Sequence, residues 1–195
     1  MAISEKRQEI LHAALELIAE HGFHGAPIAA IAAIAERAGV GAGTIYRYFE
    51  NKDVLINELF QELHDRICTG LLEGYGTDRP LRERFVHLST ALLRYFIDNP
   101  LEFRFIEQYL NSPYGNAFRR ARLMGAGEED DDPYRHLLEE GVARRIVKDL
   151  PLVVLFALAF GPLLAVARDH ILGFVALNEV LLVQTVQACW DGIKR

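Results

Sequence analysis

The sequence predicts an all-α chain, and three kinds of observation lead to this prediction. Apolar residues recur at intervals of three and four along most of the 195 residues, as in the series Leu55, Leu59, Leu63 and Ile67. No segment alternates apolar and polar residues between turn-forming residues, which is the pattern of a half-buried strand. Glycine and proline fall where helices would end or begin. With 51% apolar residues, the chain can also bury a sizeable core.

The first two helices are predicted from their apolar spacing and from the residues at their ends. In the first, apolar residues follow helical spacing over residues 10–18, with Ser4 as the expected N-cap and Gly22 as a left-handed C-terminal cap. In the second, Pro27 suits the first turn and Gly39 the end. A third short helix is expected just after Gly39.

A long amphipathic helix is predicted over residues 52–72. The segment EGYGTDRP that follows marks a boundary, because two glycines and a proline break the helical spacing. We therefore predict three parts of the chain, which are residues 1–50, a connector over residues 51–73 and a C-terminal part over residues 74–195.

The C-terminal part is predicted to hold longer and more apolar helices, interrupted by NSPYG and by the acidic loop GAGEEDDDP. They are expected over residues 80–98, from Pro100 to NSPYG, from Asp132-Pro133 onward, over 150–171 and over 178–190.

Residues 150–167 form a run of 18 residues without a charge, which is the minimal length of a transmembrane helix. Pro151, Gly161 and Pro162 interrupt this run, and charged residues close it on both sides. A helix that is apolar all round is buried either in lipid or in protein. We expect burial in protein and predict no membrane partner.

The composition limits the classes of function. The formal charge of −6 and the pI near 5.6 would repel a polyanion. The two cysteines lie far apart and the N-terminus lacks the apolar core of a signal peptide, so the expected location is cytoplasmic. The sequence shows no nucleophile–base pair, no paired carboxylates and no metal-ligand spacing among its seven histidines. We predict no catalytic residue, no metal and no cofactor.

The segment VGAGTIYRYFENK, residues 40–52, follows a predicted helix and a tight turn. This order is typical of a helix-turn-helix, whose second helix enters the major groove of DNA. Ile45 and Phe49 lie four residues apart and would face the core. Three small residues would let the backbone approach DNA, and polar residues follow them. The predicted DNA-binding residues are Gly41, Ala42, Gly43, Thr44, Tyr46, Arg47, Tyr48 and Lys52.

The polar residues of this segment suit different parts of a nucleotide. Thr44 and Tyr46 can hydrogen-bond to phosphate. Arg47 can reach a guanine edge or a phosphate, and Tyr48 can contact a sugar or a thymine methyl group. Lys52 is expected in the first turn of the next helix, where its ammonium and the free N–H groups suit an anion.

Residues 6 to 65 resemble the DNA-binding domain of TetR-family transcriptional regulators. The matching positions are Gly22-Phe23, Ile34-Ala35, Ala38-Gly39-Val40, Gly43-Thr44, Tyr46, Tyr48-Phe49, Lys52 and Leu55. The resemblance implies that Thr44, Tyr46, Tyr48 and Lys52 meet DNA. It also implies a C-terminal half that holds a small ligand and dimerises through its last two helices.

The resemblance leads us to expect a ligand-responsive regulator of transcription, and specifically a repressor. It would bind a palindromic operator as a homodimer and be released by a small apolar or amphipathic effector. Residues 1–50 would bind DNA, 51–73 would connect, and 74–195 would bind the ligand and dimerise. The alternative is an all-helical small-molecule carrier or enzyme that retains a helix-turn-helix module.

The sequence departs from the family pattern in two places. Three extra residues lie within IAAIAAIAE, residues 28–36. We expect this segment to stay helical over at least its last two turns, with Ile34 buried against the recognition helix. In addition, Ala26-Pro27 replaces the hydroxyl residues that usually start this helix, so another group or water must cap it.

The first 53 residues carry five basic and seven acidic side chains, a balance of −2 rather than the basic footprint usual for DNA binding. The expected solution is segregation, with Lys6, Arg7, Arg47 and Lys52 facing DNA and the glutamates facing away.

In the C-terminal part, aromatic and apolar residues are the candidates for ligand binding and dimerisation. Sites between the helices of a bundle are lined by such side chains. The predicted ligand-binding residues are Phe103, Phe105, Tyr109, Phe156 and Phe160. The predicted dimer interface comprises Val183, Val186 and Trp190 on the last helix.

Overall fold

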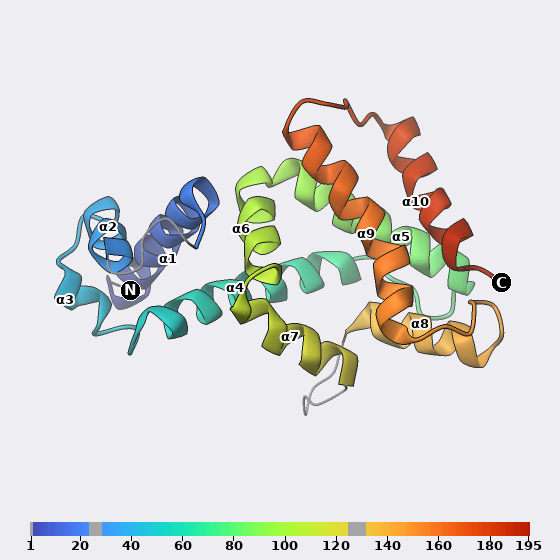
Figure 1. Ribbon diagram of the computed structural model, residues 1–195, viewed down its shortest axis with the longest axis horizontal. Helices are drawn as coiled ribbons and strands as arrows, with labels where there is room; N and C mark the ends of the chain where they lie inside the picture. The colour runs from blue at the N-terminus through green and yellow to red at the C-terminus, as the bar shows by residue number, and fades with distance from the viewer. Residues whose placement is uncertain (1, 24–28, 125–131) are drawn as a thin grey trace. The chain divides into compact units, whose positions relative to one another are not determined.

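The computed structural model describes residues 2–23, 29–124 and 132–195 of the chain (Figure 1). These residues are mainly helical and show no strand pairing beyond one isolated bridge, between Val147 and Lys194. The all-α prediction is therefore confirmed. The helices are α1 (Ala2–His21), α2 (Ala29–Arg37), α3 (Ala42–Ile45), α4 (Lys52–Leu72), α5 (Leu81–Asp98), α6 (Pro100–Leu110), α7 (Pro113–Met124), α8 (Pro133–Ala143), α9 (Leu152–Ile171) and α10 (Glu179–Ile193).

Glycine ends the first two helices as the sequence predicts. Gly22 and Gly39 have φ angles of +76° and +64°, a backbone region that glycine adopts without steric cost. The prediction for Ser4 is wrong, because α1 already begins at Ala2 and Ser4 lies inside the helix rather than at its N-cap. Pro27 lies outside the described residues.

Side-chain caps start two of the later helices. Asp132 Oδ1 accepts a hydrogen bond from the backbone N–H of Tyr134 at 3.0 Å, which confirms the predicted start at Asp132-Pro133. Asn178 Oδ1 accepts one from the N–H of Leu181 at 2.9 Å at the start of α10. That helix continues to Ile193, beyond the predicted end at residue 190.

The segment with the three extra residues folds as expected over its described part. Helix α2 runs without a break over Ala29–Arg37. Ile34 is only 1% exposed, and α2 packs against α3. The helix therefore accommodates the insertion while Ile34 keeps its place in the core; Ala26 lies outside the described residues.

The chain packs as two compact units. The N-terminal unit comprises residues 1–65 and 101–118, and the C-terminal unit comprises residues 66–100 and 119–195. Helix α4 therefore contributes its first part to one unit and its last part to the other. This grouping reflects packing alone, and the functional boundaries expected after residues 50 and 73 stay a prediction.

The core of the N-terminal unit joins the first helices to α6 and to the start of α7. Its fully buried side chains include Ile10, Ile34, Ile45, Leu55, Phe103 and Phe105. Where α6 turns into α7, the backbones approach so closely that only glycine fits. A Cβ atom on Gly115 would lie 2.5 Å from the carbonyl oxygen of Tyr109 and 2.6 Å from Cα of Leu110.

In the C-terminal unit, helices α5, α9 and α10 pack against one another, and α8 packs against α5 and α9 (Figure 1). Leu88, Leu163 and Val186 are completely buried at the centre of this arrangement. The rings of Phe85 on α5 and Trp190 on α10 lie 5.4 Å apart. Large apolar side chains from three helices thus make one core.

A buried arginine on α5 links this core to α8. Arg84, 7% exposed, donates from Nε to the hydroxyl of Tyr75 at 2.9 Å and from Nη1 to Glu140 at 2.6 Å. Arg144 donates to the same carboxylate at 2.7 Å. The hydrogen bonds from Arg84 and then Arg144 lower the pKa of Glu140 below its ordinary value.

This network predicts an acid-sensitive contribution to stability. Because the pKa of Glu140 is lower in the folded chain, its contribution is complete above the ordinary value of 4.5 and is lost as the pH falls through the folded value. Urea unfolding at several values between about pH 6 and about pH 3 should show a smaller acid loss for Glu140→Gln than for the parent. Equal acid losses in the two proteins would contradict this role for Glu140.

Helix α9 carries much of its apolar surface on the outside of the fold. It is the one described helix that is long and apolar enough to cross a membrane by length and composition. Only 22% of its most apolar stretch is buried. The rest of the chain therefore leaves most of this helix uncovered. Large apolar side chains that stay exposed on α9, α10 and the residues beside them are Leu150, Val153, Val154, Leu158, Leu172, Phe174, Val180 and Val183.

Candidate nucleic-acid interface

Two short helices and a tight turn form the centre of the candidate site. The backbone N–H of Ala38 donates a hydrogen bond to the carbonyl oxygen of Ile34 at 2.9 Å. The backbone N–H of Val40 donates to the carbonyl oxygen of Ala35, also at 2.9 Å. Together with the positive φ of Gly39, these bonds reverse the chain after α2. Gly41 is extended and leads into α3. This geometry is that of a helix-turn-helix.

The recognition helix is short, as the sequence predicts. Helix α3 covers only Ala42–Ile45, and the next residues form a hydrogen-bonded turn. Within this turn, the backbone N–H of Arg47 donates to the carbonyl oxygen of Thr44 at 3.2 Å, and the backbone N–H of Tyr48 donates to that of Ile45 at 3.0 Å. The turn holds the segment in a compact shape although the regular helix has ended.

Burial divides this segment into an inner and an outer face. Ile45 and Phe49 are each 1% exposed, as their spacing predicts. Tyr46 is 56% exposed. Of the other predicted DNA-binding residues, Gly41, Ala42, Gly43 and Arg47 are exposed, whereas Thr44, Tyr48 and Lys52 are half-buried.

Arg7 does not belong to the exposed basic face. It forms ion pairs with Glu58 at 2.7 Å and with Glu62 on α4, and its guanidinium lies 5.5 Å from the centre of the Phe49 ring. Burial alone would lower the pKa of Arg7, but the hydrogen bonds to the two carboxylates raise it above its ordinary value. Arg7 therefore ties α1 to α4, and the expectation that it faces DNA is wrong.

The remaining basic residues differ in their partners. Lys6 pairs with Glu9 at 2.7 Å, three residues along α1. Within the residues that the structure describes, Arg47 and Lys52 form no ion pair. Of the four basic residues that were expected to face DNA, Arg47 and Lys52 are thus without an acidic partner in the described part of the chain.

Lys52 begins α4 at a well-defined end. Asn51 caps this helix, because its Oδ1 accepts a hydrogen bond from the N–H of Val54 at 2.9 Å. The first N–H groups of a helix carry a partial positive charge. Lys52 therefore adds its ammonium to an electropositive helix end, which is the arrangement expected of an anion contact.

The predicted ligand-binding residues fall into both units. In the N-terminal unit, Phe103 and Phe105 are buried, and the ring of Tyr109 stacks on Phe60 with a centroid distance of 3.8 Å. In the C-terminal unit, the rings of Phe156 and Phe160 stack 5.4 Å apart.

Each of these two groups contains additional aromatic rings. Phe60 also contacts His64 and Phe118, and Phe160 contacts Tyr134. Reasoning from the sequence missed Phe60 and His64, although their spacing of four on α4 is a signal that could have found them.

The residues of the predicted dimer interface differ in accessibility. Val183 is 51% exposed on α10. Val186 is completely buried and Trp190 is 4% exposed in the single chain. The assignment of Val186 and Trp190 to the interface is therefore corrected, because their side chains already pack in the core and cannot meet a partner.

The helix-turn-helix, its exposed outer segment and the helical remainder of the chain define the class of helix-turn-helix transcriptional regulators. Two family models match the chain. One, described as bacterial regulatory proteins of the tetR family, covers residues 10–59. The other, described as a tetracyclin repressor-like C-terminal domain, covers residues 80–194. The chain belongs to the TetR family.

Several solved structures share the whole fold of this chain. A TetR family protein from Vibrio parahaemolyticus is 32% identical, with a TM-score of 0.73 over 97% of this chain and 99% of that one. A TetR family transcription regulator from Marinobacter aquaeolei is 22% identical, with a TM-score of 0.82 over 100% and 99%. The transcriptional regulator FadR from Bacillus subtilis, in complex with stearoyl-CoA, is 20% identical, with a TM-score of 0.69 over 94% and 95%.

A curated relative matches a shorter stretch of the chain more closely. The fatty acid metabolism regulator protein of Bacillus subtilis is 46% identical over 57 residues. This match covers 29% of this chain and 28% of that protein's length. The close similarity therefore concerns less than a third of each chain.

Proposed function

We propose that this protein is a ligand-responsive transcriptional repressor of the bacterial cytoplasm. It binds a palindromic operator as a homodimer and leaves it when a small apolar or amphipathic effector binds. The observation that carries the proposal is that Arg47, in the exposed turn after α3, and Lys52, at the start of α4, form no ion pair with any residue that the structure describes. In a chain of charge −6, two unpaired cations beside an exposed Tyr46 are suited to a phosphate backbone.

The proposed contacts with DNA follow from exposure. The small residues Gly41, Ala42 and Gly43 are exposed and leave room for close approach of the two backbones. Tyr46 and Lys52 bind phosphate, and Arg47 reaches a base edge or phosphate in the major groove. Thr44 and Tyr48, which are half-buried, contribute their outer atoms.

The proposed effector class follows from the aromatic residues and from two relatives. The Phe60–Tyr109 and Phe156–Phe160 ring groups offer apolar side chains in both units. One relative is named as a regulator of fatty acid metabolism, and a FadR structure contains stearoyl-CoA. Both names are consistent with an amphipathic effector that has a long apolar part.

The proposed homodimer follows from the apolar surface of α9 and α10. Exposed apolar patches of this extent on a protomer mark an interface. Pairing with a second copy would bury Val153, Val154 and Val183 and bring two helix-turn-helix modules to one DNA site.

The phosphate contact of Lys52 is testable through its salt dependence. Lys52→Ala should weaken binding to specific and non-specific DNA about equally. It should also lower the salt slope, which is the steepness with which the logarithm of the affinity falls with the logarithm of the salt concentration. The expected change is about 0.9 for each DNA-binding head, meaning each helix-turn-helix with the start of its α4. Fluorescence anisotropy of labelled operator fragments, recovered from genomic DNA that the protein retains, would measure both quantities.

Arg47→Ala should instead relax sequence specificity, at a cost of about 1–3 kcal/mol in binding free energy if the guanidinium reads guanine.

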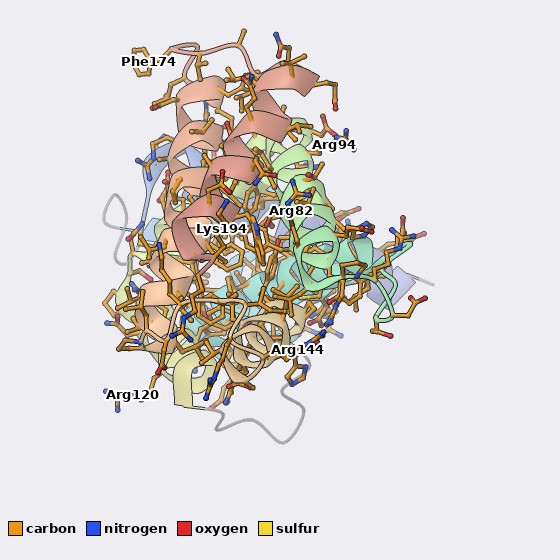
Figure 2. All side chains as sticks on the ribbon, turned by 90° about the vertical axis from the view of Figure 1, so that its right-hand side faces the viewer. Arg82, Arg94, Arg120, Arg144, Phe174 and Lys194 are labelled. Carbon is orange, nitrogen blue, oxygen red and sulfur yellow. The ribbon has the colours of Figure 1, made fainter. Side chains whose placement is uncertain are left out.

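Lys194→Ala is the matched control for Lys52→Ala, since it removes an exposed cation from the C-terminal unit (Figure 2). An unchanged salt slope in Lys52→Ala would remove this contact from the proposal.

A further inference from the structure

A hydrogen bond joins α7 to the DNA-facing end of α4. The hydroxyl of Tyr114 donates to Asp53 Oδ1 at 2.6 Å. Asp53 is exposed and directly follows Lys52 in the first turn of α4. Both partners belong to the N-terminal unit. A tyrosine from a later helix thus forms a hydrogen bond with the acidic neighbour of the proposed phosphate contact.

Tyr114 is held firmly as a hydrogen-bond donor. Its ring lies 5.4 Å from that of Phe23 and stacks on Tyr109 at 6.1 Å. Its backbone N–H donates to the hydroxyl of the buried Ser112 at 3.2 Å. Burial, together with the hydrogen bond to Asp53, raises the pKa of Tyr114 to about 12. The hydroxyl therefore keeps its proton at any pH at which DNA binding is measured.

The carboxylate of Asp53 is a potential competitor for the site that a phosphate would occupy. Lys52, the first N–H groups of α4 and the positive end of the helix all attract an anion. A carboxylate one residue away, on a rotatable side chain, is attracted to the same groups. It also repels a phosphate directly. Its orientation therefore bears on how strongly this helix end binds DNA.

We propose that Tyr114 is a positioning residue for DNA binding, which holds the Asp53 carboxylate against α7 and leaves Lys52 and the end of α4 to a DNA phosphate. The inference rests on the proposed function, because it presumes that Lys52 meets DNA. Tyr114 itself is not among the proposed contacts with DNA. It acts through Asp53, and its effect disappears when the charge of Asp53 is removed.

The test compares operator binding by Tyr114→Phe, Asp53→Asn and the double variant. Tyr114→Phe keeps the ring and releases the carboxylate, so affinity should fall roughly threefold per head and about tenfold for an operator bound by two heads. The salt slope should fall toward that of Lys52→Ala, because Asp53 then partly neutralises Lys52. In the Asp53→Asn background, the further change Tyr114→Phe should alter neither quantity.

Asn57→Ala is the matched control. Asn57 lies one turn further along α4 and accepts an equivalent hydrogen bond from Tyr109 at 2.8 Å, but it carries no charge. Its loss should leave operator affinity and salt slope unchanged. Thermal unfolding of each variant shows whether a loss of affinity reflects a loss of folded protein.

Three outcomes would overturn the inference. Equal losses of affinity on Tyr114→Phe with and without the charge of Asp53 would show that Tyr114 is only structural. Unchanged binding by Tyr114→Phe, while Lys52→Ala still lowers the salt slope, would remove the positioning role and leave the proposed function standing. An unchanged salt slope in Lys52→Ala would refute the phosphate contact itself, and the positioning role with it.

Discussion

Val183→Asp is expected to turn the proposed dimer into a folded monomer and to weaken operator binding by about a hundredfold or more. Val183 is 51% exposed on α10, so a charge there leaves the protomer's own core intact. In a dimer the same position would be buried, and an unpaired carboxylate in an apolar interface is strongly unfavourable. A monomer can place only one helix-turn-helix on the operator and loses the second set of contacts.

Sedimentation at micromolar concentration should show the parent at about twice 22.0 kDa and Val183→Asp at 22.0 kDa. Two variants separate this effect from others. Leu72→Asp adds the same charge at an exposed apolar position of α4 and should leave assembly unchanged. Val186→Asp places the charge in the protomer's core and should unfold the protein, as circular dichroism would show. A Val183→Asp monomer that still binds a full palindrome tightly would contradict the dimer mechanism.

Gly115→Ala is expected to destabilise the protein by about 3 kcal/mol, at the upper end of the usual range for overpacking. The added Cβ would lie 2.5 Å from the carbonyl oxygen of Tyr109 and 2.6 Å from Cα of Leu110. Both contacts are with backbone, which cannot rotate away as a side chain can. The α6–α7 junction must open, and the rings that it carries must shift with it.

Gly70→Ala is the opposite case and serves as the control. Nothing lies within 4 Å of the Cβ that it would add on α4. Replacing a helical glycine by alanine without a clash should stabilise the chain by roughly 0.5–1 kcal/mol. Calorimetry should therefore give melting temperatures on opposite sides of the parent. A stabilised Gly115→Ala variant would mean that α6 and α7 are packed less closely than the distances of 2.5 and 2.6 Å indicate.

Features determined by neighbouring residues could be predicted from the sequence. Gly22 and Gly39 end helices because each adopts a positive φ, and Asp132 caps the helix that follows it. The burial of Ile45 and Phe49 follows from their spacing of four. The extra triplet was accommodated in α2 because its apolar residues keep helical spacing.

Features that depend on distant partners could not be predicted. Nothing near Arg7 in the sequence indicates that Glu58 and Glu62, more than fifty residues away, neutralise it. The periodicity of α10 shows which residues are apolar. It does not distinguish a face that packs within the protomer, as at Val186, from one left for a partner, as at Val183.

The membership of residues 101–118 in the N-terminal unit has a practical consequence for chimeric regulators. A graft that transferred only residues 1–65 to another effector-sensing body would leave behind Tyr109 and Tyr114, the donors to Asn57 and Asp53. The transplanted head would carry an uncovered face on α4 and a carboxylate without its donor. A working chimera must therefore take two separate segments from this chain, residues 1–65 and residues 101–118, so that α6 and the start of α7 are transferred with the DNA-binding helices.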